Sequence, residues 1–377
     1  MNRKNICEIC TLIMGQSPDS KSYNKDKNGI PFYQGNADFG EEHPTPTVWC
    51  TAPKKIARKG DILISVRAPI GDMNIANEDC CIGRGLAAIR LNKSDIVDIN
   101  YLYHYLSATV EFLQEQGTGS TFKAINKTTL EGIEIPCPSI EKQKNIAKLI
   151  IEIKTSIQYK KAELFALNEL VKSRFIEMFG DIRISSIFPN IALENFAQIG
   201  SSKRVHAADY VESGVPFYRS KEIIELGNGQ EPSVELFISK KQYESIKKTN
   251  GVPCKGDLLM SAVGTIGKMW IVDGRKDFYY KDGNIISIHS EETNPIYLKE
   301  ALANLIDDFK SANVAGSAYS ALTIVKLKKM TVPMPPMSIQ NEFADFVKLI
   351  DKSKFIVQKQ IDDLQELLDS KMDEYFG

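Results

Sequence analysis

Apolar residues recur at alternating three- and four-residue steps along two long stretches of the chain, residues 136–180 and 333–377. The repeat continues for about five heptads in each stretch, which is typical of a coiled-coil helix. A helix of about 40 residues is about 60 Å long at 1.5 Å per residue. Such a helix is too long to lie against one small domain, so both stretches are predicted to connect separate domains.

The two stretches are copies of one design. Gln143 corresponds to Gln340 and Phe179 to Phe376, because 340 − 143 and 376 − 179 both equal 197. The predicted helices therefore have the same length. Each apolar seam has a basic residue where the other has an aliphatic one, which suggests that the helices pack on each other as an antiparallel pair. The seam positions are Ile146, Ile150, Ile153, Ile157, Lys160, Leu164, Leu167, Val171, Arg174 and Met178 in the first helix, and Phe343, Val347, Ile350, Lys354, Val357, Ile361, Leu364, Leu368, Lys371 and Tyr375 in the second.

The repeat extends upstream of each helix. Pro31-Phe32-Tyr33 precedes Gly60-Asp61 in the first half, and Pro216-Phe217-Tyr218 precedes Gly256-Asp257 in the second. The offset grows from 216 − 31 = 185 to 256 − 60 = 196, so the second copy carries 196 − 185 = 11 additional residues, which are expected to lengthen a loop. Each Gly-Asp turn leads into an apolar strand, a glycine-containing loop and a further strand. The predicted fold class is α+β, with two pseudo-symmetric globular domains separated by two long antiparallel coiled-coil helices.

These patterns divide the chain into four segments. Residues 1–135 and 181–332 are predicted to form the globular domains, and residues 136–180 and 333–377 the helices. An apolar content of 43% and a charged content of 25% are those of a soluble globular protein. The chain has no apolar run of about 18 residues and no signal peptide at its start, so a cytoplasmic location is expected.

No catalytic motif is readable in the sequence. Gly117-Thr118-Gly119-Ser120 lacks the Gly-Lys-Ser/Thr ending of a phosphate-binding loop, and no Gly-x-Gly-x-x-Gly follows a predicted strand. The four histidines are not at metal or triad spacing. Cys7 and Cys10 have no second cysteine pair at zinc-finger spacing, so reduced thiols and no metal site are expected. The chain is therefore predicted to bind a partner rather than to catalyse a reaction.

Positive charge is concentrated locally, although the net charge is −1. Residues 51–67 carry five basic residues and one acidic residue, and so do residues 240–255, which gives 5 − 1 = +4 in each segment. Both segments precede or overlap the Gly-Asp strand of their half. Lys54 and Lys55 in the first and Lys240 and Lys241 in the second are therefore candidates for phosphate contact, the main source of affinity for duplex DNA.

The ordered set of landmarks resembles the specificity subunit of type I restriction-modification systems over the whole chain. Ile135-Pro136-Cys137-Pro138 leads to Gln143 and looks like the segment that precedes the family's central helix. Val332-Pro333-Met334-Pro335 leads to Gln340 with the same spacing and matches the segment before the C-terminal helix. The remaining landmarks are the two Pro-Phe-Tyr segments, the two Gly-Asp strands and the two loops that end in Ile70-Gly71 and Ile266-Gly267.

The resemblance implies two target-recognition domains, each of which reads one half of a bipartite DNA sequence, while the helices fix the unread spacer. It also implies that two modification subunits dock on the chain, bind adenosylmethionine and methylate an adenine in each half-site, and that restriction subunits join them. The chain itself is then expected to hold no cofactor and to have no membrane partner. Apolar residues off the helix seam are expected to face the partner subunits, namely Phe165, Leu170, Phe175 and Ile176.

Loops that follow the shared landmarks are the candidates for contact with DNA bases, since polar side chains at groove edges read sequence. The candidates are Gln34, Asn36, Arg67, Thr121 and Lys123 in the first half and Arg219, Lys221, Thr265, Lys268, Ser317 and Tyr319 in the second. Two alternatives remain: a stand-alone DNA-binding regulator built from the same modules, and a bifunctional enzyme, which would need nuclease and methyl-donor motifs.

Overall fold

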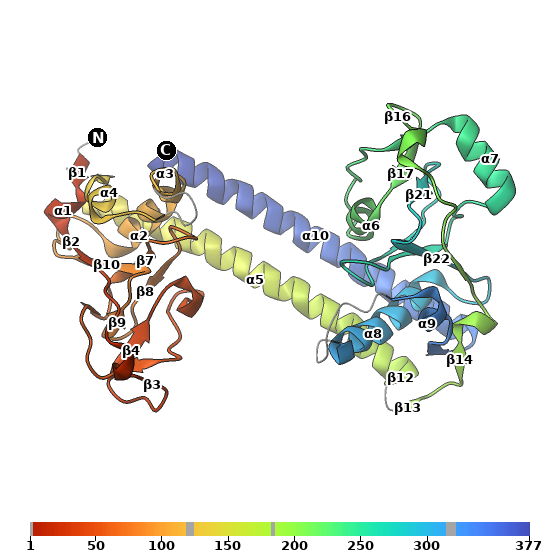
Figure 1. The fold of residues 1–377 in the computed structure, drawn as a ribbon, viewed down its shortest axis with the longest axis horizontal. Helices are drawn as coiled ribbons and strands as arrows, with labels where there is room; N and C mark the ends of the chain where they lie inside the picture. The colour runs from red at the N-terminus through yellow and green to blue at the C-terminus, as the bar shows by residue number, and fades with distance from the viewer. Residues whose placement is uncertain (1–2, 118–123, 182–184, 314–321) are drawn as a thin grey trace. The chain divides into compact units, whose positions relative to one another are not determined.

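The computed structural model describes residues 3–117, 124–181, 185–313 and 322–377, and it divides into two compact units (Figure 1). Unit 1 comprises Met1–Lys161 with Lys359–Gly377, and unit 2 comprises Ala162–Gln358. Each unit holds one α+β module and part of both long helices. The boundaries cut the two helices at equivalent positions, because 358 − 161 = 197.

Two helices of 40 residues each dominate the secondary structure, α5 (Ile140–Phe179) and α10 (Met337–Phe376). Their first residues are offset by 337 − 140 = 197, so the predicted equality of length is confirmed. None of the twenty seam positions is exposed, which confirms the heptad pattern.

The helix pair is antiparallel, as the sequence predicted. In unit 2 the end of α5 meets the beginning of α10, where the Arg174 guanidinium lies 3.2 Å from the Glu342 carboxylate. In unit 1 the end of α10 accompanies the beginning of α5, and the Phe376 ring packs edge-on against Tyr101, 5.4 Å between centroids. Together with the mixed modules, this confirms the predicted fold class.

Unit 1 contains two sheets and a short strand pair. One sheet has four strands in the order β2-β10-β7-β8, and the other has five in the order β3-β5-β4-β9-β6, with β4 and β9 parallel. Strand β1 pairs with β11, which leads into α5. The elements are β1 (Arg3–Asn5), α1 (Ile6–Ile9), β2 (Cys10–Met14), β3 (Tyr23–Asn24), β4 (Ile30–Tyr33), β5 (Trp49–Cys50), β6 (Ile56–Ala57), β7 (Ile62–Ser65), β8 (Met73–Ile75), β9 (Cys80–Ile82), β10 (Leu86–Leu91), α2 (Ile99–Ala108), α3 (Val110–Glu115), α4 (Lys127–Glu131) and β11 (Glu134–Pro136).

Unit 2 repeats this plan. One sheet has the order β15-β22-β19-β20 and the other β16-β18-β17-β21, with β17 and β21 parallel, while β14 pairs with β23 ahead of α10. The elements are β12 (Gly180–Asp181), β13 (Ser185–Ser186), β14 (Asn190–Ala192), β15 (Gln198–Gly200), β16 (Tyr210–Val211), β17 (Val215–Tyr218), α6 (Ser220–Gly227), β18 (Phe237–Ile238), α7 (Lys240–Asn250), β19 (Leu258–Ser261), β20 (Met269–Ile271), β21 (Tyr279–Tyr280), β22 (Ile285–His289), α8 (Pro295–Asn313), α9 (Ile324–Lys328) and β23 (Thr331–Pro333).

The additional residues of the second half do not lengthen a loop, so that expectation is wrong. Eight of the eleven lie between β18 and β19, because 258 − 238 = 20 whereas 62 − 50 = 12 in unit 1, and this segment forms α7 where unit 1 has the short strand β6. Ser239 caps this helix by accepting a hydrogen bond from the Gln242 backbone N–H at 3.2 Å. Tyr243 and Ile246, three residues apart, bury one face of α7 in the core of unit 2, and this burial stabilises a helix over a loop.

A buried glutamine joins each long helix to its module. The Gln143 side-chain amide donates to the carbonyls of Ile96 and Pro138, both at 2.9 Å, and its oxygen accepts from the Asp98 N–H at 3.0 Å. Gln340 does the same in unit 2, donating to the Pro335 carbonyl at 2.9 Å and accepting from the backbone N–H of the residue before α8 at 2.8 Å. The Pro-x-Pro segment and its glutamine therefore position the start of each helix.

Candidate DNA interface

The Gly-Asp strand of each unit is held by its aspartate. Asp61 is buried and forms a two-pointed ion pair with Arg90 on β10, at 2.7 and 3.0 Å. Asp257 is also buried and contacts the His289 ring nitrogen on β22 at 2.7 Å. Each carboxylate also accepts from a backbone N–H three residues earlier, at 2.8 Å in both units. These aspartates therefore stabilise the strand.

The loop after each Gly-Asp strand is shaped by a buried serine. The Ser65 hydroxyl lies 2.8 Å from the Arg67 carbonyl, and the Ser261 hydroxyl lies 2.5 Å from the Thr265 carbonyl. Each loop ends at a glycine with positive φ, +100° in unit 1 and +78° in unit 2. The residues that recur between the halves thus build the loop, whereas Arg67, Thr265 and Lys268, which differ between the halves, are exposed.

Four segments of unit 1 meet beside this loop through a series of backbone hydrogen bonds. Gly85 N–H donates to the Gln34 carbonyl at 3.2 Å, Val66 N–H to the Gly85 carbonyl at 2.9 Å, and Ile125 N–H to the Val66 carbonyl at 3.0 Å. The segment after β2 joins them, because Gln16 N–H donates to the carbonyl at the end of β9 at 3.0 Å. We call this place, with the side chains of Ser17, Gln34, Arg67 and Arg84, the loop corner of unit 1.

All four side chains of the loop corner are polar, and three of them are exposed: Gln34, Arg67 and Arg84. Neither arginine takes part in an ion pair with any residue that the structure describes. Arg84 was not among the predicted site residues. It lies in a Gly-Arg-Gly turn between two buried strands, and this pattern in the sequence could have identified it as an exposed basic residue.

The equivalent corner of unit 2 has the same backbone arrangement. Lys281 N–H donates to the Tyr218 carbonyl at 2.9 Å, and Ala262 N–H donates to the Asn284 carbonyl at 2.8 Å. The turn from 281 to 284 carries Asp282 where that of unit 1 carries Arg84. Asp282 pairs with Arg204 at 2.8 Å.

Arg219 takes the place of Gln34 in unit 2, but its side chain is committed to internal pairs. It contacts Glu222 at 2.9 Å and Glu235 at 2.8 Å, and Glu222 is fully buried. The hydrogen bonds that Arg219 donates to Glu222 first, and then to Glu235, raise its pKa above the usual range. Lys221 is also bound to Glu235, at 3.2 Å. Both predicted residues would have to leave these carboxylates before they could contact DNA.

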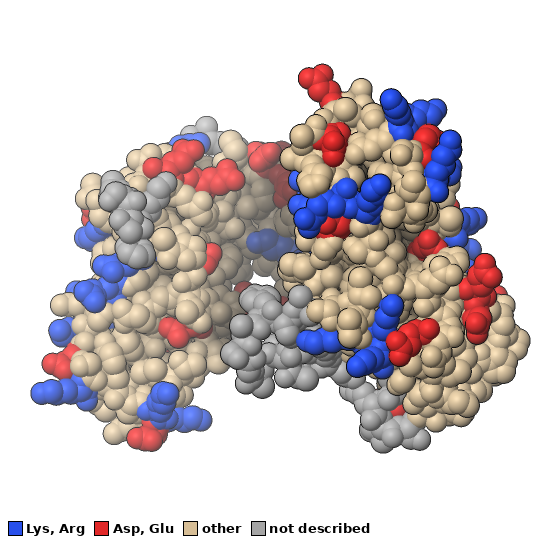
Figure 2. Space-filling view, turned by 45° about the vertical axis from the view of Figure 1, so that its right-hand side comes forward, with Lys and Arg blue, Asp and Glu red and all other residues tan. Residues whose placement is uncertain are grey.

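The other candidate DNA contacts fall into two groups. Asn36 is half-buried and donates to the Asp72 carboxylate at 2.7 Å. The predicted lysines are exposed, Lys54 and Lys55 between β5 and β6, and Lys240 and Lys241 in the first turn of α7. In Figure 2, Lys and Arg side chains gather on the upper part of unit 2, with acidic side chains between them. Four candidates lie outside the described residues: Thr121, Lys123, Ser317 and Tyr319.

Three of the four predicted partner-facing residues are exposed on α5. Phe165 is 66% exposed, Leu170 46% and Ile176 44%. The expectation that Phe175 is exposed is wrong, because it is 1% exposed and packs against Phe343 with ring centroids 5.6 Å apart. Near its end α5 contacts α8 as well as α10, so a second stripe beside the seam is buried there.

The structure adds exposed apolar residues that the sequence prediction did not include. They lie near the middle of the long helices and are more exposed than most of the predicted ones. These residues are Tyr159 at 73%, Phe355 at 71% and Ile356 at 57%.

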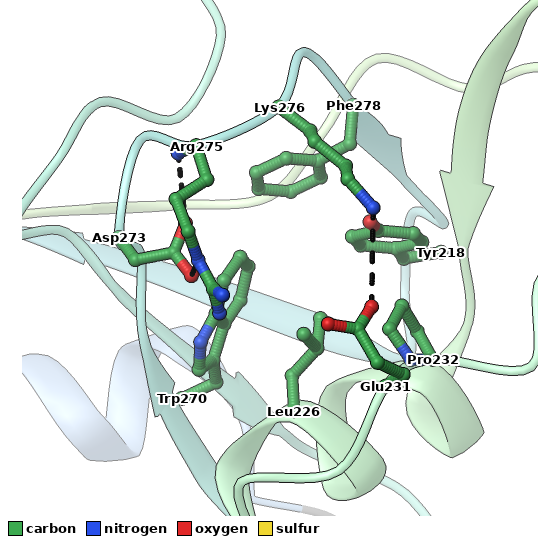
Figure 3. A pocket seen from close by; sticks show the side chains of 9 residues that line it. All are labelled: Tyr218, Leu226, Glu231, Pro232, Trp270, Asp273, Arg275, Lys276 and Phe278. Atoms are coloured by element: carbon green, nitrogen blue, oxygen red, sulfur yellow. Dashed lines mark hydrogen bonds and ion pairs between the residues drawn. The ribbon is translucent and has the colours of Figure 1, made fainter.

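An aromatic cavity in unit 2 is too small for a cofactor. Tyr218 and Phe278 stack with centroids 4.8 Å apart, and Lys276 lies 3.8 Å from Glu231 across the opening (Figure 3). Its volume of about 30 Å³ holds little more than a water molecule. Within the described ranges, no group of His, Cys, Asp and Glu side chains could hold a metal ion, and no helix is long and apolar enough to cross a membrane.

The family described as "Type I restriction modification DNA specificity domain" matches the chain twice, at residues 1–169 and 188–366. The chain belongs to this family. The two matches coincide with the two α+β modules and their helices. The family is described by DNA specificity in type I restriction-modification systems, and the chain carries two copies of its domain.

The curated relatives are specificity subunits of type I restriction enzymes. A putative one from Methanocaldococcus jannaschii, MjaX, is 45% identical over 177 residues, 46% of this chain and 41% of the relative. A putative one from Haemophilus influenzae is 27% identical over 70% of this chain and 66% of the relative. The chain therefore matches less than two thirds of the length of these two relatives. The MjaIX subunit of M. jannaschii is 24% identical over 97% of this chain and 90% of the relative.

Two solved structures share the fold. The type I S subunit from M. genitalium aligns over 100% of this chain and 96% of its own, with a TM-score of 0.59 and 16% identity. A structure that concerns complex assembly and conformational transition of a type I system aligns over 100% and 97%, with a TM-score of 0.61 and 14% identity. At these identities the likeness supports the architecture alone.

Proposed function

We propose that the chain selects the DNA target of a type I restriction-modification complex, with each α+β module reading one half of a bipartite sequence. One observation carries this proposal. In both units a recurring serine and glycine hold the loop after the Gly-Asp strand in place, and the exposed polar residues Arg67, Thr265 and Lys268 stand at loop positions whose residues differ between the halves. Two domains that share a loop backbone but differ in its polar side chains are suited to recognise two different short DNA sequences.

The long helices would set the distance between the two half-sites. Equal helices of 40 residues run from each module, and each is about 60 Å long at 1.5 Å per residue. A coiled-coil pair keeps its length because its seam residues pack against each other, and none of them is exposed here. The spacer of the target would then follow the number of heptads in the helix pair.

The partners would be two modification subunits and, through them, the restriction subunits. Exposed apolar residues on the long helices support such docking, because water-exposed aromatic side chains are typical of interaction surfaces. Phe165, Leu170 and Ile176 on α5, together with Phe355 on α10, are candidates for the contact. Adenosylmethionine and adenine methylation would belong to the modification subunits, with no cofactor bound by this chain.

Phosphate contacts would supply the sequence-independent part of DNA affinity. Lys54 and Lys55 in unit 1 and Lys240 and Lys241 in unit 2 are exposed, and each pair precedes the Gly-Asp strand of its unit in the sequence. Lysines on the phosphates position the duplex, and groups at the loop corners would then reach the base edges. Thr265 and Lys268 in unit 2 would reach the bases from the exposed loop after β19.

The test is co-expression of the chain with its modification subunits, followed by single-molecule sequencing of host DNA for methylated adenine. A bipartite motif that appears only with the chain present is the expected result. Exchange of residues 1–135 for those of another family member should change one half of that motif. An assembled complex that methylates no defined motif would contradict the proposal. The stand-alone regulator has no support among the relatives, which are specificity subunits.

A further inference from the structure

A cavity of about 460 Å³ opens in unit 2 beside the aspartate of the Gly-Asp strand. It lies between β21 and the loop that follows α7. In unit 1 the corresponding segment is strand β6, which pairs with β9. In unit 2 β21 is the last strand of its sheet, and the residues between α7 and β19 form no strand. The space that strand pairing closes in unit 1 is therefore open in unit 2, and its volume is that of a small-molecule site.

The residue that contacts the aspartate differs between the units. Arg90 and His289 are equivalent, because each follows the residue that faces the first position of the Gly-Asp strand. The Arg90 guanidinium donates to Asp61 Oδ2 at 2.7 Å and reaches on to the Ile56 carbonyl at 3.4 Å. The shorter His289 ends with its ring nitrogen 2.7 Å from Asp257 Oδ1. Unit 2 thus lacks the guanidinium that unit 1 places beside its aspartate.

Asp257 keeps an acceptor position that Asp61 uses. Asp61 Oδ2 accepts from the Arg58 backbone N–H at 2.8 Å and from the Arg90 guanidinium. Asp257 Oδ2 accepts from the Cys254 backbone N–H at 2.8 Å, and the described residues give it no second donor. A carboxylate oxygen accepts two hydrogen bonds. Because Asp257 lines the cavity and is only 8% exposed, a donor in the cavity would meet it in a poorly hydrated place, where a charge-assisted hydrogen bond is strong.

The rest of the lining favours an organic cation. Among the described residues that line the cavity, Asp257 is the one carboxylate, and none is a lysine or arginine. Tyr279 and Tyr280 contribute aromatic rings, on which a guanidinium stacks well. Gln198 and Ser201 add side-chain oxygens that accept further N–H donors. An anion would find no opposite charge here, whereas a planar cation finds a carboxylate, rings and acceptors.

We propose that this cavity binds a small alkylguanidinium compound. Its guanidinium would donate to Asp257 Oδ2, as Arg90 does to Asp61 in unit 1, and would lie against the tyrosine rings. One or two charge-assisted hydrogen bonds correspond to a dissociation constant of about 1 mM. The site is separate from DNA recognition and does not rest on the proposed function.

Agmatine is the probe, and protection of Cys254 is the readout. Cys254 lines the cavity and is exposed, and Cys7 in unit 1 is also exposed. Alkylation of the full chain by iodoacetamide, followed by peptide mass spectrometry, gives a separate rate for each thiol. Agmatine at about 10 mM should slow alkylation of Cys254 about 3- to 10-fold, because most of the sites would be filled. The rate at Cys7 should not change.

Putrescine is the matched control compound, since it is a dication of the same chain length with an ammonium group in place of the guanidinium. It should protect Cys254 at least about 3-fold less, because an ammonium is not a planar fork of donors. His289→Arg is the decisive variant. It supplies a guanidinium from the chain itself, as in unit 1, and should abolish protection by agmatine. Glu291→Gln removes an exposed carboxylate nearby in the sequence and should leave protection intact.

Protection of Cys254 alone, lost in His289→Arg and weaker with putrescine, is the result that supports the site. An unchanged rate at Cys254 would overturn the inference, and so would equal slowing of Cys7 or equal protection by putrescine. Protection that persists in His289→Arg would place the ligand elsewhere and overturn it too. Should this variant not fold, the comparison of agmatine with putrescine on the wild-type chain decides. The methylated motif tests the proposed function separately, so each can fail without the other.

Discussion

At the scale of single residues, Gln143 and Gln340 attach the long helices to their α+β modules by hydrogen bonds. Both are almost fully buried, and both hydrogen-bond to the backbone that precedes α2 or α8. A buried amide costs about 1–3 kcal/mol when its partners are lost, because the remaining backbone groups stay unsatisfied. The spacing between the Pro-x-Pro segment and the glutamine is therefore fixed by hydrogen-bond geometry.

Gln143→Ala should lower the free energy of unfolding of unit 1 by about 2–3 kcal/mol, since three buried hydrogen bonds are lost. Differential scanning calorimetry of the full chain measures the change. Gln158→Ala, an exposed glutamine on the same helix, is the control and should change stability by less than about 0.5 kcal/mol. Equal effects of the two variants would contradict the docking role.

A second residue-scale feature is a pair of titratable groups whose charge differs between the units. His104 on α2 is buried 3.5 Å from the Lys154 amine on α5, and the equivalent positions of unit 2 carry Glu300 and Asp351, because 300 − 104 = 196 and 351 − 154 = 197. Burial, and then the charge of Lys154, lower the pKa of His104 to about 4. Burial raises the pKa of Glu300 above its usual value.

Acid should therefore destabilise unit 1 through His104. Its pKa is about 4 in the folded chain against 6.5 in the unfolded one, so the neutral form contributes stability above about pH 6.5 that is lost as the pH falls towards 4. The loss should reach about 2 kcal/mol at pH 5. His104→Gln should reduce the pH dependence of the melting temperature of unit 1 between pH 7 and 5. His43→Gln, at an exposed histidine, should leave that pH dependence unchanged. An unaltered pH profile in His104→Gln would refute this origin.

At the scale of elements, the loop after the Gly-Asp strand depends on glycine for two separable reasons. Gly264 and Gly267 both have positive φ, +73° and +78°. A Cβ at Gly264 would meet nothing within 4 Å, whereas one at Gly267 would lie 2.4 Å from Ile306 on α8. The first glycine is thus required by the backbone alone, and the second also by the packing of the helix against the loop.

Gly264→Ala should cost about 1–2 kcal/mol from backbone strain, and Gly267→Ala about 1–3 kcal/mol more because Ile306 must move. Urea unfolding gives the free energy of unfolding of both variants. Because each variant adds the same methyl group, the difference between the two free energies is the cost of packing against Ile306. If the two variants prove equally stable, α8 does not constrain the loop in the way the structure indicates.

The long helices present two kinds of aromatic residue at the element scale. Phe175 is 1% exposed in the core of unit 2, and Phe165 is 66% exposed. Phe175→Ala should lower stability by about 3–5 kcal/mol because a large buried side chain leaves a cavity. Phe165→Ala should leave stability within about 0.5 kcal/mol but weaken co-purification with the modification subunits. Unchanged co-purification would remove Phe165 from the proposed docking surface.

At the scale of the whole molecule, helix length is the property to test. One heptad inserted before Leu164 and one before Ile361, which are equivalent because 361 − 164 = 197, preserves both seams. Each helix becomes about 10 Å longer, and the recognised spacer should grow by about three base pairs. Methylome sequencing should show the same two half-sequences at a greater distance. Altered half-sequences at an unaltered distance would disprove the ruler role of the helices.

The sequence by itself determined the repeated architecture. Heptad spacing located both helices, and the constant offset of 197 gave their equal length and their equivalence, because a buried seam imposes the same period wherever it occurs. The Gly-Asp strand and the Pro-x-Pro segment were recognisable for the same reason, since each is a short local pattern. The α+β modules and the family followed from the order of these patterns along the chain.

Tertiary structure decided what depends on residues distant in the sequence. The burial of Phe175 follows from its contacts with Tyr297 and Phe343, 122 and 168 residues further on, as 297 − 175 and 343 − 175 show. The ion pair of Arg219 with Glu235 likewise joins two separate segments of unit 2. The hydrogen bond between Gln34 and Ser17 does the same in unit 1. No local periodicity encodes such contacts, because they arise only when strands and helices pack into one core.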